Sequence, residues 1–110
     1  NANDCADRMM YDAINYFNDE DFAKQVALHQ WLYRKLLKFA YDNGFEDTAE
    51  WGETFDHYSI FYAHKRHCFM VDVNCECQSA GVYFSTEKAA EQAIEEVVKP
   101  FVKEHPDFVW

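Results

Sequence analysis

Histidine and cysteine side chains cluster in the middle of the chain, and they are the residue types best suited to nucleophilic or metal chemistry. The cluster consists of His57, His64, His67, Cys68, Cys75 and Cys77. A cysteine thiolate needs a base within hydrogen-bond reach and an oxyanion site before it can act as a catalytic nucleophile. His67 and Cys68 are neighbours on an expected strand, so their side chains point to opposite faces and make a poor catalytic pair.

Zinc binding is also disfavoured by the spacing. Cys75 and Cys77 share a face of a strand, but they lack the Cys-x-x-Cys spacing of zinc knuckles and thioredoxin motifs. On one continuous strand, His67 and Cys75 would lie about 26 Å apart at about 3.3 Å per residue, too far for one ion. Free, mostly buried thiols are therefore expected at Cys5, Cys68, Cys75 and Cys77.

Other catalytic patterns are missing from the sequence. There is no Gly-rich phosphate loop, no Gly-x-Ser-x-Gly and no His-Glu-x-x-His. Asp56 and Asp72 fall on opposite faces of the expected hairpin, and His29 is expected to be a satisfied core histidine. His64 and His67 fit surface positions or a weak pH-sensitive pair. We predict no catalytic residue, cofactor or metal ligand. A small enzyme or metal-binding module built on the hairpin histidines and cysteines is the alternative.

Acidic residues dominate the charge of the 110-residue chain, whose formal net charge is −10. Phosphate binding needs a basic face, so the charge argues against duplex nucleic acid as a direct partner, and we predict no direct duplex binding. One stretch holds six acids and no Lys or Arg: Asp42, Glu46, Asp47, Glu50, Glu53 and Asp56. It is either a solvated connection that maintains solubility or a surface that docks on a protein partner with a basic surface.

Composition favours one domain over residues 1–110 with its own core, because 49% of residues are hydrophobic and only three are Gly. Asn1 and Ala2 could be the remnant of a purification tag. No stretch approaches the ~20 apolar residues that span a membrane, and no signal segment is visible. We expect a cytoplasmic protein without membrane contact, although a missing natural start would leave export open.

The spacing of apolar residues along the chain predicts helices in the first part, followed by strands. Helical spacing predicts helices over residues 4–17 and 20–42, and alternation predicts strands over 55–64 and 67–75. A tight turn at Lys65-Arg66, or a four-residue loop with the same centre, puts Ile60 opposite Val71 and Phe61 opposite Met70. A further helical turn from Thr48 is also expected.

A third strand is expected from Gly81, followed by a helix over residues 86–103 that Pro100 should bend. The predicted fold is therefore α+β: two N-terminal helices, a three-stranded antiparallel sheet and a C-terminal helix packed on one sheet face. Ile60, Val71, Ile94 and Val97 should be buried together, and the apolar residues 107–110 should dock on the body.

The second face of the hairpin carries Phe61 and Met70 near its tip, which makes them candidate protein-contact residues together with the six acids. Self-association as a two-fold dimer would cover this face. Alternatively, the N-terminal helices could cover it in a three-layer monomer.

The second half of the chain resembles the C-terminal ends of small uncharacterised proteins from phages and mobile elements of gut and related bacteria. The matching residues are Tyr58, Ile60, Tyr62, Val71, Val73, Gly81, Phe84, Ser85, Ala90, Ala93 and Ile94. The resemblance implies no known activity. Together with the charge, it favours a small acidic protein-interaction module that binds another protein.

Overall fold

The computed structural model describes residues 19–43, 51–52 and 55–110. The helix expected over residues 4–17 and the turn expected from Thr48 fall outside these ranges. The described elements are α2 (Glu20–Asp42), β1 (His57–Ala63), β2 (Cys68–Asn74), α3 (Glu87–Ala93), the π-helix η1 (Ile94–Val98) and α4 (Lys99–Glu104). The fold is α+β, as the periodicity predicts.

Helix α2 has the bounds that the sequence predicts, because both of its ends are capped by side chains. The Asp19 carboxylate accepts hydrogen bonds from the backbone N–H groups of Asp21 (2.8 Å) and Phe22 (3.2 Å). At the other end, the Asn43 side chain donates to the Phe39 carbonyl at 2.8 Å. One stripe of the helix is buried: Leu28, Leu32, Leu36 and Ala40.

Strands β1 and β2 form an antiparallel hairpin in the predicted register, with Ile60 opposite Val71 and Phe61 opposite Met70. The expected two-residue turn is wrong, and the alternative four-residue loop over residues 64–67 is present. Two-residue turns of the favoured type need positive φ at both central positions, which Lys and Arg disfavour. The longer loop has a positive φ at His67 alone among its residues (φ 53°).

The expected third strand is reduced to a single bridge, in which Tyr58 and Phe84 exchange two backbone hydrogen bonds of 3.0 and 2.7 Å. Among the described residues, the sheet therefore has two strands. The Tyr83 hydroxyl accepts a hydrogen bond from the Ser79 backbone at 2.7 Å and also bonds the Ser79 hydroxyl at 2.9 Å. These bonds span a bend at residues 80–81, where the chain does not continue as a strand along β1.

The C-terminal helix is continuous from Glu87 to Glu104, but its middle is the π-helix η1. The Thr86 hydroxyl caps its start by accepting from the Ala89 backbone at 3.1 Å. Pro100 lies in the first turn of α4, directly after η1. A proline ring clashes with the carbonyl four residues earlier in a regular helix. The bend expected from Pro100 is thus accommodated by a widened turn.

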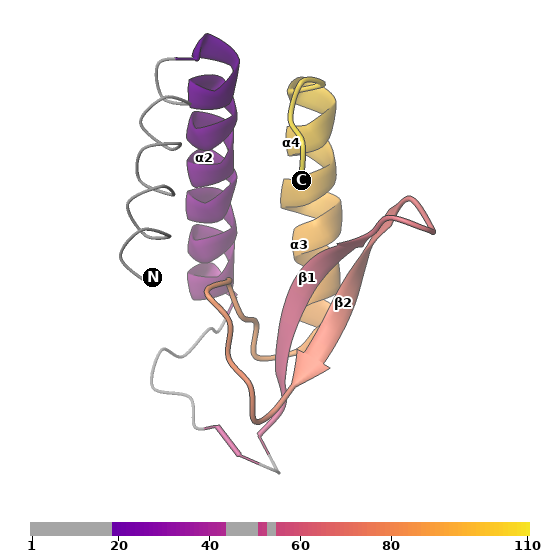
Figure 1. Ribbon diagram of the computed structural model, residues 1–110. Coiled ribbons are helices and arrows are strands. Elements are labelled where there is room, and N and C mark those ends of the chain that lie inside the picture. The colour runs from indigo at the N-terminus through magenta and orange to yellow at the C-terminus, as the bar shows by residue number, and fades with distance from the viewer. Residues whose placement is uncertain (1–18, 44–50, 53–54) are drawn as a thin grey trace, which may run out of the picture.

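The elements form two layers, with α2 and the C-terminal helix side by side and the hairpin packed across α3 (Figure 1). Ile94 is buried as predicted, whereas Ile60, Val71 and Val97 are only partly buried. Helix α2 packs against α3 and η1, so the three-layer arrangement with this helix on the second hairpin face is wrong. No helix within the described ranges is long and apolar enough to cross a membrane.

Candidate functional site

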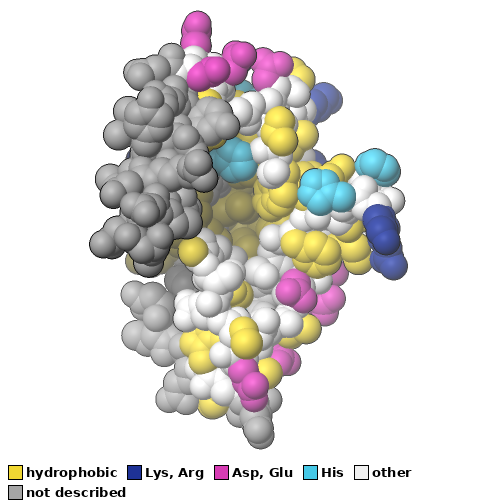
Figure 2. All heavy atoms as spheres, in the orientation of Figure 1, with side chains coloured by type: hydrophobic (Ala, Val, Ile, Leu, Met, Phe, Trp, Pro, Cys, Tyr) yellow, Lys and Arg dark blue, Asp and Glu magenta, His cyan; other side chains and the backbone are white. Residues whose placement is uncertain are grey.

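An apolar hollow of about 240 Å³ opens between α2 and the hairpin. Figure 2 shows hydrophobic side chains recessed in this region, with histidine side chains nearby. Its described lining comes from α2, β1 and the ends of two loops: His29, Leu32, Tyr33, Leu36, Ile60, Gly81, Val82, Phe84, Phe108 and Trp110. Because Gly81 and Val82 line it, the hollow lies where the missing third strand would have run.

Beyond Tyr58, no described residue pairs with the β1 edge that lies beside the hollow. Tyr58 exchanges both of its backbone hydrogen bonds with Phe84, so its N–H and C=O groups point away from β2. Backbone direction alternates along a strand, and the corresponding groups of Ile60 and Tyr62 therefore point the same way. No described residue forms a strand pair with Ile60 or Tyr62 on that side.

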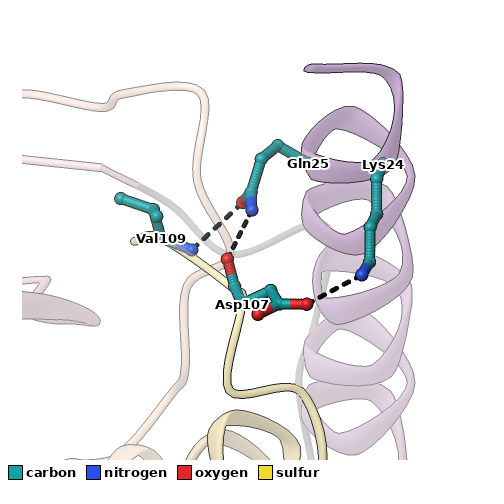
Figure 3. Close-up of polar contacts among 4 residues, drawn as sticks. All are labelled: Lys24, Gln25, Asp107 and Val109. Atoms are coloured by element: carbon teal, nitrogen blue, oxygen red, sulfur yellow. Dashed lines mark hydrogen bonds and ion pairs between the residues drawn. The ribbon is translucent and has the colours of Figure 1, made fainter. Parts of the chain in front are cut away.

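Three polar side chains of α2 hold residues 107–110 against the helix, and we call Lys24, Gln25 and His29 the clamp. Figure 3 shows the contacts of Lys24 and Gln25. Lys24 forms an ion pair with the Asp107 carboxylate at 2.8 Å. The Gln25 side-chain amide donates to the Asp107 carbonyl at 2.5 Å and accepts from the Val109 backbone N–H at 3.0 Å. His29 donates through Nε2 to the Val109 carbonyl at 2.6 Å. The predicted docking of this end segment is confirmed.

Aromatic rings complete the clamp. Phe108 is 9% exposed, and its ring centroid lies 4.6 Å from that of His29 and 5.4 Å from that of Phe101. Trp110 contacts the Phe69 ring edge-on at 5.0 Å. The sequence predicts a core position for His29, which is wrong: the residue is exposed, and its ring covers Phe108 while its nitrogen holds the Val109 backbone.

The ion pair between Lys24 and Asp107 shifts the pKa of both side chains. The hydrogen bond and the charge attraction from Lys24 hold the Asp107 pKa below its ordinary value of 3.8. The same hydrogen bond and attraction raise the Lys24 pKa above its ordinary value of 10.5. Both side chains are more than half exposed, so solvent screens this attraction and the backbone contacts of Gln25 contribute the more specific part.

The predicted protein-contact residues lie on two separate surfaces. Phe61 is 39% exposed and faces half-buried Met70 on the outer side of the hairpin. Asp56 is exposed before β1, while exposed Asp42 pairs with Lys38 at 2.9 Å at the end of α2. The other four acids, Glu46, Asp47, Glu50 and Glu53, lie outside the described ranges.

The cysteines do not occupy the positions that the sequence predicts. Cys68 and Cys77 are exposed and Cys75 is half-buried, all three with free thiols, and Cys5 lies outside the described ranges. Among the described elements, α3 packs on one face of the hairpin and α2 packs against α3 and η1, and Cys68 on the other face is exposed.

The hairpin histidines are spread over different surroundings. His57 is buried and stacks on Trp51 at 3.8 Å, whereas His64 and His67 are exposed in the loop. Within residues 19–43, 51–52 and 55–110, no group of three or more His, Cys, Asp or Glu side chains could hold a metal ion. The alternative of a metal-binding hairpin therefore has no geometric support in this part of the chain.

No protein-family model matches the sequence, and neither curated proteins nor solved structures gave a match. The hollow and the unpaired part of the β1 edge were not predicted from the sequence. Of the clamp, the docking of residues 107–110 was predicted, but not the side chains of α2 that hold them. The one available signal for the clamp was the polar pair Gln25 and His29, which are four residues apart and therefore neighbours on one side of α2.

Proposed function

We propose that this chain is a small acidic protein-interaction module that binds an extended segment of another protein beside β1. The observation that carries the proposal is the backbone edge at Ile60 and Tyr62, which lies next to the apolar hollow and pairs with no described residue. In strand addition, main-chain hydrogen bonds supply affinity and neighbouring pockets select side chains. Both parts are available at this edge.

The chain's own Phe84 supports this mode of binding, since it pairs with Tyr58 on the same edge and in the antiparallel direction. The hollow is also large enough for a ligand side chain. An engineered cavity of about 150 Å³ accommodates benzene, so about 240 Å³ can take one large apolar side chain. A partner strand at Ile60 and Tyr62 would continue the pairing that Phe84 begins.

Charge adds a preference for the partner. The net charge of −10 and the exposed carboxylate of Asp56 before β1 favour a partner with a basic surface next to its apolar segment. The exposed pair of Phe61 and Met70 is a second candidate contact on the outer hairpin face. A phage or mobile-element origin and a cytoplasmic setting are parts of the same proposal.

Affinity capture with matched surface variants tests the proposal. Tyr33 is 45% exposed and lines the hollow, whereas Tyr41 is 74% exposed elsewhere on the same helix. A captured protein should be lost with Tyr33→Glu and retained with Tyr41→Glu, provided that both variants keep the circular dichroism of the parent. Loss with Phe61→Ser alone would instead place the contact on the outer hairpin face.

A further inference from the structure

The edge of β2 that faces away from β1 pairs with no described residue. Its pairing with β1 fixes which backbone groups lie on this edge. Val73 is opposite Tyr58, whose N–H and C=O groups bond Phe84 and therefore point away from β2. In such a pair of an antiparallel ladder the groups of both residues point outward, and the pattern repeats at every second residue. The N–H and C=O groups of Phe69, Val71 and Val73 thus lie on this edge of β2.

A surface hollow of about 500 Å³, here called the β2 hollow, lies between this strand and the C-terminal helix. Strand β2 contributes Phe69, Met70 and Val71 to its lining, and the helix contributes Lys99 and Ile94, the latter only 6% exposed. Helix α3 packs against β2 (Figure 1). A strand added to β2 would therefore run beside the β2 hollow, with every second side chain facing the helix.

Three glutamates form the helix wall of the β2 hollow: Glu87, Glu91 and Glu95, here called the acidic row. They are four residues apart, so they follow one another on one side of the helix. All three are exposed. Glu95 pairs with Lys99 at 2.6 Å, whereas Glu87 and Glu91 form no ion pair with a described residue. Two carboxylates beside the apolar lining therefore have no basic partner within the described ranges.

The spacing of the acidic row matches that of alternate residues in an extended chain. Four residues of a helix advance by about 6 Å, at about 1.5 Å per residue. Two residues of a strand advance by about 6.8 Å, at about 3.4 Å per residue. Lys or Arg side chains at alternate positions could therefore reach successive carboxylates, while their apolar stems cover Phe69, Val71 and Ile94.

From this geometry we propose that the β2 edge and the acidic row bind an extended segment of a partner protein with Lys or Arg at alternate positions. Backbone hydrogen bonds to β2 supply affinity for an extended chain, and the acidic row selects the basic side chains. This site lies on the opposite edge of the hairpin from the hollow beside β1, so it goes beyond the proposed function and does not depend on it.

Charge favours a basic partner over a second copy of the chain at this edge. Two β2 edges that paired with each other would bring two acidic rows together, and each chain carries a net charge of −10. Like charges on neighbouring strands and helices destabilise such a contact. A basic segment is attracted instead, and its binding should weaken as salt is added.

Peptide titration of the full chain, followed by NMR, tests the proposal. The probe is the capped peptide KTKVKTK, and the matched peptide KKKKTVT has the same composition and charge without the alternation. The alternating peptide should bind at least about threefold more tightly at about 0.15 M salt, where exposed charges more than about 8 Å apart are largely screened. It should also shift the amide signals of Val71 and Val73, which would gain hydrogen-bond partners.

Variants of the acidic row test the selection of basic side chains. Glu87→Gln together with Glu91→Gln should weaken binding of the alternating peptide about three- to tenfold, as expected for two exposed ion pairs. The matched control is Glu96→Gln together with Glu104→Gln, which removes the same charge from the helix outside the β2 hollow. The control should weaken binding less than about twofold.

Variants of Val73 test the backbone contact. Val73→Pro removes an N–H that points away from β1, so the hydrogen bonds between β1 and β2 stay in place. It should weaken binding about two- to tenfold, as expected for one lost hydrogen bond and a blocked edge. Val73→Ala keeps the N–H and is the control, which should bind as the parent does. Circular dichroism checks that both variants are folded.

Three results would overturn the proposal: no shifts at Val71 and Val73 with millimolar peptide, equal affinity of the two peptides, or insensitivity to the paired substitutions of Glu87 and Glu91. Self-association that Val73→Pro removes, without binding of the alternating peptide, would assign the edge to a second copy instead. Tyr33→Glu, which alters the hollow beside β1, should leave the peptide affinity unchanged, so the two binding sites can fail separately.

Discussion

At the scale of single residues, Gln25 has the most informative position in the molecule. A primary amide offers one donor and one acceptor side by side, which matches the pattern on the edge of an extended chain. Through its bonds to the Asp107 carbonyl and the Val109 N–H, one helix side chain holds the main chain of residues 107–109. Neither Asn, which is one methylene shorter, nor Glu, which lacks donors, would be expected to make both contacts.

The Lys24–Asp107 pair predicts a pH dependence of segment docking. Docking lowers the Asp107 pKa. The carboxylate therefore contributes fully to the stability of the docked segment at pH values above 3.8, and this contribution is lost as the pH falls through the lowered pKa. Docking raises the Lys24 pKa. The ammonium group therefore contributes fully to docking at pH values below 10.5, and this contribution is lost as the pH rises through the raised pKa. The Phe108 ring signals in NMR spectra should report undocking at both extremes.

Asp107→Asn should weaken docking at neutral pH and remove the part of the acid response that belongs to this pair. Asp42→Asn removes a comparable exposed ion pair with Lys38 and is the control, since it lies far along α2 from the segment. An unchanged acid response in Asp107→Asn would show that the pair does not contribute to docking.

Ile94→Ala should lower the free energy of unfolding by about 2 kcal/mol, the lower end of the usual range for a buried Ile. Ile94 is 6% exposed, but it also lines a surface hollow between β2 and the helix, so the site can relax. Urea denaturation measures the change. Val73→Ala, at a residue 52% exposed, is the control and should cost less than about 0.5 kcal/mol. A comparably small loss for Ile94→Ala would contradict its burial.

At the scale of elements, local patterns determined what could be predicted. The bounds of α2 follow from Asp19 and Asn43 at its ends, and the hairpin register follows from the alternation of apolar residues on each side of the loop. These signals depend on neighbours in the sequence. For that reason α2 and the pairing of Ile60 with Val71 agree with the structure.

Features that depend on distant contacts could not be predicted. In place of the third strand, residues 80–81 form a bend, and the hydroxyl of Tyr83 bonds Ser79 across it. The role of His29 depends on residues about 80 positions later in the chain. Burial of Cys68 was expected from its residue type, but it depends on which hairpin face the helices cover. The hollow and the clamp arise from such contacts, so periodicity carries no signal for them.

Because Pro100 follows the π-helix η1, we expect the stability effects of deleting Glu96 and of Pro100→Ala to depend on each other. Deleting the exposed residue Glu96 should convert η1 into regular α-helix while keeping Phe101 in the core. Pro100 would then lie in the interior of a regular helix, at a cost of about 3 kcal/mol. Combining the deletion with Pro100→Ala should recover most of that stability in urea denaturation.

Pro100→Ala alone is the control for this pair. It should retain η1, because a regular helix of the same length would rotate Phe101, which is 1% exposed, out of the core. If the deletion and the substitution were simply additive, Pro100 would not be the reason that the wide turn exists.

At the scale of the whole molecule, the described elements form two layers, in which no described helix covers the outer hairpin face. The described helices all lie against the opposite face or beside one another, and Phe61 on the outer face is 39% exposed (Figure 1). The hollow and this outer face are therefore separate apolar surfaces on opposite sides of the hairpin. Each can be altered without touching the other, which makes variants of Phe61 suitable controls for the hollow.

Self-association through the outer hairpin face is the last prediction. We expect a reversible two-fold dimer that buries Phe61 and Met70, and that strengthens with added salt because two chains of charge −10 repel each other. Sedimentation equilibrium measures it, and Phe61→Ser should shift the population towards monomer. A single species near 13.1 kDa at all concentrations and salt levels would remove the dimer. The exposed Phe61 would then have to be explained by a different protein partner, whose capture should depend on Phe61 and not on Tyr33.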